Sequence, residues 1–136
     1  MDHTTPPDLA PRLDDLEALA EAAFAQLPGY VRQAAADVVI RVAEFAPEEM
    51  LADMEIDDPF SLTGLYEGVA LTERTHDAPP DLPATVWLFR RPILDEWVSR
   101  GDVGLAHLVS HVLVHELAHH LGWSDDDIAA VDDWTL

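Results

Sequence analysis

With 136 residues, 49% of them hydrophobic, the chain is long enough for one domain with a modest core and too apolar to be disordered. Its formal net charge of −20 argues against nucleic acid or an anionic membrane as a partner, and no apolar run approaches the roughly 18 residues of a membrane-spanning helix. The absence of cysteine excludes disulfides and thiolate metal sites, so His, Asp and Glu remain as metal ligands.

The N-terminal segment carries three prolines, and we expect residues 1–11 to be a disordered lead-in to a single domain over residues 12–136. This lead-in is acidic and lacks the apolar core of a signal peptide. The expected location is therefore the cytoplasm. We also expect the protein to be a monomer.

Hydrophobic periodicity, turn residues and β-branched content predict the elements of the domain. In chain order these are a helix over 13–26, a short helix or turn over 30–35, a strand over 38–43, an acidic loop with a helical turn over 46–59, a strand over 65–72, a loop over 75–83, a strand over 85–89, a short helix from Pro92 to Trp97, a long helix from Asp102 to Leu121 and a last short helix over 125–131. The strand at 85–89 is apolar on both faces, which is typical of a central strand.

The long helix carries a His-Glu-x-x-His motif at His115, Glu116 and His119. Histidines four residues apart lie on one side of a helix with about 5–6 Å between their Cβ atoms, so both imidazoles are able to bind one ion. Glu116 lies about 100° further round the helix, which makes it a poor ligand for the same ion. That position suits a general base, which takes a proton from a water that the metal activates.

The residues after the motif support a metal site. Gly122 lies where the helix would end, and glycine adopts the left-handed conformation that reverses the chain there. Ser124 is the expected N-cap of the next helix, with Asp127 as its capping partner. Asp125 would then lie at a helix N-terminus, which favours its ionised form, and could reach the open side of the metal. We predict one zinc ion per chain, bound by His115, His119 and Asp125.

The motif and two further segments resemble the small bacterial minimal zincin family. Residues 64–74, Gly-Leu-Tyr-Glu-Gly-Val-Ala-Leu-Thr-Glu-Arg, resemble the family's GLYxGxPLTER segment with Ala70 in place of its proline, and residues 88–94, Leu-Phe-Arg-Arg-Pro-Ile-Leu, resemble its LYRRPIL segment. The resemblance covers roughly residues 13–133. It implies an α+β, zincin-like fold, in which a small mixed sheet of about three to four strands packs on the long active-site helix with flanking helices.

The resemblance also implies zinc bound by His115, His119 and Asp125, with Glu116 as the base. The motif is similar to that of the metzincin peptidases as well, but all three methionines precede it and only eleven residues follow Asp125. We therefore expect neither the Met-turn of those enzymes nor a full C-terminal subdomain that would deepen a substrate cleft.

These patterns predict a zinc-dependent metallopeptidase that hydrolyses peptide bonds with a zinc-activated water and Glu116 as general base. The expected substrate is a peptide or an unfolded protein segment, held in extended form at a sheet edge beside the long helix. The alternative is a non-catalytic zincin-fold module that binds a peptide or a protein and has a structural or vestigial metal site. Glu116 favours the enzyme, because a structural site needs no base beside its first histidine.

Other polar residues have weaker claims to a role. The candidates for stabilising an oxyanion are Tyr66, Arg74, Arg90 and Arg91. Arginines in such segments are at least as often structural, pairing with Asp or Glu to tie loops to the sheet. His107 and His111 continue the four-residue spacing of the motif, and we expect them to make helix-face or supporting contacts in preference to a second metal site. His120 points about 100° away from the metal side and is expected to make a structural hydrogen bond.

Overall fold

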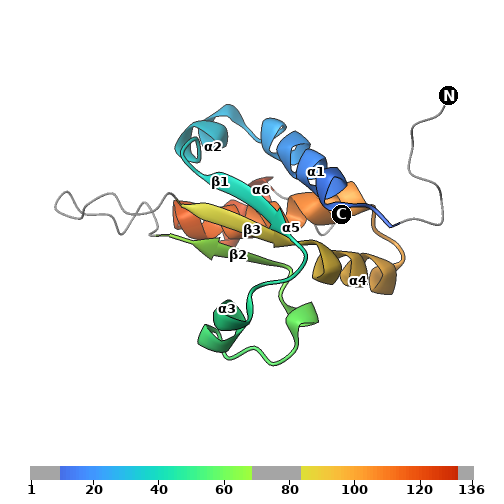
Figure 1. Ribbon diagram of the computed structural model, residues 1–136. Coiled ribbons are helices and arrows are strands. Elements are labelled where there is room, and N and C mark those ends of the chain that lie inside the picture. The colour runs from blue at the N-terminus through green and yellow to red at the C-terminus, as the bar shows by residue number, and fades with distance from the viewer. Residues whose placement is uncertain (1–9, 69–83, 132–136) are drawn as a thin grey trace.

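The structure is a computed structural model that describes residues 10–68 and 84–131, without the side chains of Asp125, Ala129 and Val131. Six α-helices and three strands follow one another within these residues (Figure 1). Most of the predicted lead-in, the predicted loop at 75–83 and the second half of the predicted strand at 65–72 lie outside the described residues.

A three-stranded mixed sheet forms the centre of the described structure (Figure 1). Strand β1 (Val39–Ala43) runs parallel to β3 (Thr85–Phe89), and β2 (Gly64–Glu67) pairs antiparallel with the other side of β3. The strand order β1-β3-β2 makes β3 central, which confirms the prediction from its apolar residues. Val86 and Leu88 of β3 are fully buried on one face of the sheet.

That face packs against two helices, α1 (Leu13–Ala25) and α5 (Leu105–Leu121). In Figure 1, α5 lies behind the sheet and α1 lies above it, beyond β1. Buried core residues contributed by the three elements include Leu16 and Ala20 of α1, Val86 and Leu88 of β3, and Leu108, Val109, Leu113 and Leu117 of α5. Since each buried aliphatic side chain contributes about 1.5–3 kcal/mol, this core holds α5 firmly against the sheet.

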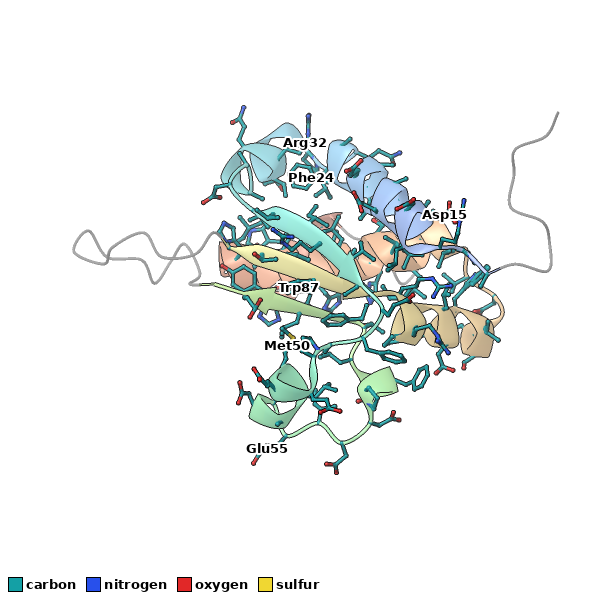
Figure 2. The ribbon with its side chains drawn as sticks, in the orientation of Figure 1. Asp15, Phe24, Arg32, Met50, Glu55 and Trp87 are labelled. Carbon is teal, nitrogen blue, oxygen red and sulfur yellow. The ribbon has the colours of Figure 1, made fainter. Side chains whose placement is uncertain are left out.

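The opposite face of the sheet is partly covered by the segment between β1 and β2. This segment contains α3 (Glu48–Asp53) and a 3₁₀ turn, η1 (Pro59–Ser61), where the sequence predicts an acidic loop with a helical turn. Figure 2 shows Met50 between α3 and the sheet, and Trp87 on the sheet itself. The second apolar cluster that results contains Ala46, Met50, Leu51, Leu65, Trp87 and Phe89.

Two helices begin at positions other than those predicted. Helix α4 (Arg90–Arg100) starts directly after β3, two residues before Pro92, because the fixed φ angle of proline suits the whole first turn of a helix. Helix α5 starts after Gly104, which replaces Asp102 as the N-cap. The reason is Gly101, whose left-handed φ of 73° ends α4 and leaves the next residues to redirect the chain.

The remaining elements match the sequence closely. Helix α1 ends at Ala25, shortly before Pro28. The segment predicted as a short helix or turn is a helix, α2 (Gly29–Ala34), and α6 (Asp125–Val131) has the predicted bounds. The architecture is therefore the predicted α+β one, with a small mixed sheet packed on a long helix. Within the part of the chain that the structure describes, no helix combines the length and the apolar character needed to cross a membrane.

Candidate metal centre

Two neighbouring rows of side chains on α5 build the candidate centre, and in each row the residues lie four apart, one helical turn from the next. The outer row is composed of His107, His111, His115 and His119. The inner row is composed of Leu108, Val112, Glu116 and His120. The inner row faces β2, where Gly64 lies against Val112 and Glu116, and Tyr66 lies against His120. In the outer row, His115 and His119 are exposed to solvent.

The structure brings three of the predicted site residues together. Nε2 of His119 lies 4.0 Å from Oε1 of Glu116, and His115 is also near enough to act electrostatically on that carboxylate. The side chain of His119 is 68% exposed, whereas that of Glu116 is only 17% exposed. Two imidazoles thus lie at the surface of α5, with a partly buried carboxylate beside them.

Glu116 lies where α5 passes close to β2. Burial raises the pKa of its carboxyl group above the ordinary value of 4.5, while His119, His115 and a hydrogen bond from the backbone of Tyr66 lower it again in part. Gly64 makes the close approach possible, because a Cβ there would lie 2.8 Å from Cγ1 of Val112 and 3.2 Å from Cγ of Glu116. The packing of β2 therefore limits where the Glu116 side chain is able to lie.

The turn after α5 has the predicted local structure. Gly122 is the C-cap of α5 in the left-handed conformation, with a φ of 67°. The Ser124 N–H donates to Oδ2 of Asp127 at 3.0 Å, and the Asp127 N–H donates to Oγ of Ser124 at 3.3 Å, which completes a capping box. Helix α6 consequently begins at Asp125, but the side chain of this predicted third ligand lies outside the described residues.

The donor groups on α5 fit a zinc ion in part. Among the described side chains, no three from His, Asp or Glu are grouped as they would be around a metal ion. His115 and His119 nevertheless offer two imidazole nitrogen donors at the exposed surface of one helix, the kind of pair that catalytic zinc sites use with a third protein ligand. The described part of the centre therefore contains two candidate ligands, His115 and His119, and the carboxylate of Glu116.

His120 is fully buried and connects α5 to two other parts of the chain. Its Nδ1 lies 2.8 Å from the hydroxyl oxygen of Tyr66, and its Nε2 lies 3.5 Å from Oδ1 of Asp37, just before β1. The predicted structural hydrogen bond of His120 is thereby confirmed. The sequence does not identify Tyr66 as the partner of His120. It indicates only that Gly64 and Tyr66, two residues apart in a predicted strand, share one face of the sheet.

His111 supports His115 directly, because their rings meet edge to face with 4.4 Å between centroids. His107 lies one turn earlier in the same row and is exposed.

Two of the oxyanion candidates tie α4 to distant segments. Nε of Arg90 donates to the backbone oxygen of Pro11 at 2.6 Å, and its Nη1 lies 2.7 Å from Oε1 of Glu44. The guanidinium group of Arg91 lies over the ring of Phe45, 5.6 Å from its centroid. Arg90 and Arg91 therefore connect distant segments, which is the structural alternative considered for these arginines. Arg74 lies outside the described residues.

Comparison with known proteins identifies one family. The family model of zincin-like metallopeptidases matches residues 35–135, a range that includes all three strands of the sheet, α5 and α6. No curated protein matches the chain.

Proposed function

The chain belongs to the zincin-like metallopeptidase family, and on this basis we propose that it is a zinc-dependent peptidase. His115, His119 and Asp125 are the proposed zinc ligands, and Glu116 is the proposed general base. The observation that carries the proposal is the place of Glu116. Its carboxylate lies between strand β2 and the exposed imidazoles, 4.0 Å from Nε2 of His119.

The metal and the helices would have separate tasks. A zinc ion, when bound, supplies Lewis acidity, which lowers the pKa of a water to about 7 and polarises a carbonyl group. Helix α5 holds His115 and His119 one turn apart, and its opposite side is fixed in the core. The capping box at the start of α6 fixes the backbone of Asp125 at a helix N-terminus, where a carboxylate is favoured.

Glu116 would move the proton. As general base it takes a proton from the attacking water, and as general acid it gives this proton to the leaving amine. Burial raises its pKa toward neutral pH, where a carboxyl group exchanges protons most efficiently in both directions. The nearby imidazoles and the hydrogen bond from Tyr66 favour the ionised form with which the reaction must begin.

The nearest place for an extended peptide is the outer side of β2. This strand pairs with β3 on one side only within the described residues, and its outer side lies beside Glu116. A peptide or an unfolded protein segment would add to it through the outward main-chain groups that Glu116 leaves available. The exposure of His119 supports a shallow, open site, which suits a flexible chain better than a folded domain.

The first test measures the metal. Protein purified without a chelator is expected to contain about one zinc ion per chain by elemental analysis. The substitution Asp125→Ala is expected to weaken zinc binding at least about tenfold, whereas Asp126→Ala, on the next residue of α6, is the matched control and should leave it unchanged. Equal affinities in the two variants would remove Asp125 from the ligand set, and a protein that cannot be loaded with zinc would refute the proposal.

The second test measures cleavage of unfolded peptides by mass spectrometry. Glu116→Gln is expected to keep its zinc and to lose about 10²–10⁴-fold of the cleavage rate, because it removes the proton acceptor. An unchanged rate would exclude Glu116 as the base. A fully zinc-loaded wild-type protein that binds peptides and cleaves none would support the alternative, a non-catalytic peptide- or protein-binding module.

A further inference from the structure

We propose that Tyr66 is a positioning residue for Glu116, which it holds through contacts of both its backbone and its side chain with α5. The proposal rests on the general-base role proposed for Glu116. It is carried by three features of the described structure: the direction of the Tyr66 backbone, the hydrogen bond of its hydroxyl group, and the matched spacing of strand and helix.

The backbone N–H of Tyr66 points away from β3. In an antiparallel pair of strands, hydrogen-bonded and non-hydrogen-bonded residue pairs alternate. Phe89 donates its N–H to the backbone oxygen of Thr63 at 2.9 Å, in the register of the β2–β3 pairing, so Tyr66 and Val86 form a non-hydrogen-bonded pair. The Tyr66 N–H is therefore directed to the outer side of β2, toward Glu116, whose Cγ lies next to Gly64 of the same strand.

The side chain of Tyr66 meets the same helix one turn later. Its hydroxyl group lies 2.8 Å from Nδ1 of His120, four residues after Glu116. His120 is fully buried, with its other ring nitrogen 3.5 Å from Oδ1 of Asp37, so the surrounding core restricts the position of its ring. The hydroxyl group thus anchors Tyr66 to the buried side of α5, while the N–H of the same residue faces the proposed base.

The repeats of strand and helix match along this contact. Gly64 and Tyr66 are two residues apart in β2, which is about 6.4–6.8 Å, and one four-residue step along α5 is about 6 Å. Gly64 consequently fits against Val112 and Glu116, while Tyr66 fits against Glu116 and His120. Because both pairs of contacts depend on one register, a shift of Tyr66 at its hydroxyl group also moves its N–H relative to Glu116.

Amide hydrogen exchange, measured residue by residue by NMR, tests this link without any need for turnover. Tyr66→Phe keeps the ring and removes only the hydroxyl group. The amide at position 66 is expected to exchange at least about tenfold faster, while the amide at position 65, whose partner is Trp87 within the sheet, changes less than about twofold. The control is Tyr30→Phe, at an exposed tyrosine of α2, which should alter neither amide.

A second variant keeps the test decisive if Tyr66→Phe does not fold. Glu116→Ala removes the proposed acceptor and leaves Tyr66 and His120 in place, so the amide at position 66 should again exchange at least about tenfold faster. Unchanged exchange at position 66 in either folded variant overturns the proposal. Equal acceleration at positions 65 and 66 in Tyr66→Phe also overturns it, because the hydroxyl group would then stabilise the strand as a whole.

Turnover provides an independent readout once cleavage of a peptide is found. Tyr66→Phe is expected to lower kcat about tenfold or more while KM and zinc content stay within about twofold, since substrate and metal still bind but the base is displaced. An unchanged kcat overturns the proposal. A wild-type protein without any cleavage counts against the proposed function alone, and amide exchange then decides by itself whether Tyr66 holds Glu116.

Discussion

At Gly64 the missing side chain sets the distance between β2 and α5. A Cβ at this position would lie 2.8 Å from Cγ1 of Val112, 3.0 Å from the backbone oxygen of Trp87 and 3.2 Å from Cγ of Glu116. Two of these three neighbours belong to the inner row of α5. The glycine therefore matters here for the close approach of two backbones, and its φ angle plays no part.

The substitution Gly64→Ala is expected to lower the free energy of unfolding by about 1–3 kcal/mol, because backbone and packed side chains must shift to admit the methyl group. The measurement is urea denaturation. Gly29→Ala is the matched control in α2, where a Cβ would meet only Nη2 of Arg32 at 3.8 Å. This control should be neutral or stabilising by about 0.4–1 kcal/mol, and equal effects of the two substitutions would contradict the prediction.

We expect the stability of the metal-free protein to fall with rising pH because of Glu116. Its pKa is raised in the folded state, so between pH 4.5 and that raised value the folded chain binds more protons than the unfolded chain. Stability from this group is therefore fully present below pH 4.5 and is lost as pH rises through the folded pKa.

Urea denaturation of wild type and Glu116→Gln, in the presence of a chelator and between about pH 4 and pH 8, isolates this term. The stability of wild type relative to the variant is expected to fall as pH rises. A difference that stays constant or increases with pH would show that burial does not dominate the environment of Glu116.

At the scale of elements, local chemistry predicted most of the helices and their ends. Pro28 lies beyond the end of α1, Gly122 ends α5, and the Ser124–Asp127 capping box starts α6. These signals lie within a few residues of the structure that they determine, so a single sequence reveals them. They also placed His115 and Glu116 on one helix, which is why that part of the site could be predicted.

The features that could not be predicted depend on segments far apart in the chain. Tyr66 and His120 are 54 residues apart, and nothing local to either residue identifies the other as its partner. The predicted start of α5 was wrong for a different, local reason. Asp102 is a good N-cap by residue type, but the left-handed turn at Gly101 fixes the direction in which the chain leaves α4.

We expect the capping box at the start of α6 to stabilise the folded protein. Ser124→Ala removes the acceptor of the Asp127 N–H and is expected to lower the free energy of unfolding by about 0.5–2 kcal/mol. Ser99→Ala, at an exposed site inside α4, is the control and should be neutral or slightly stabilising, since alanine is the better helix former. Chemical denaturation measures both, and a Ser124→Ala protein as stable as wild type would show that the cap contributes nothing.

For the whole molecule, the net charge of −20 is the dominant electrostatic property. Repulsion among like charges opposes the compact state, and salt screens it, with a Debye length of about 10 Å at 0.1 M. The melting temperature of the metal-free protein is therefore expected to rise by several degrees between about 0.02 and 0.3 M NaCl. Choline chloride at the same ionic strength should act alike, and a melting temperature that falls with salt would contradict the prediction.

The strand order also decides when the chain is able to fold. β1 and β2 follow each other in the sequence but are separated by β3 in the sheet. The partner of β1 is β3, in which Thr85 pairs with the distant Val39. Closing such loops costs entropy before any pairing offsets it, so we expect the sheet to form only after β3 is available. Helix α5 follows all three strands in the chain, so the proposed zinc ligands His115 and His119 are synthesised only after every strand of the described sheet has been made.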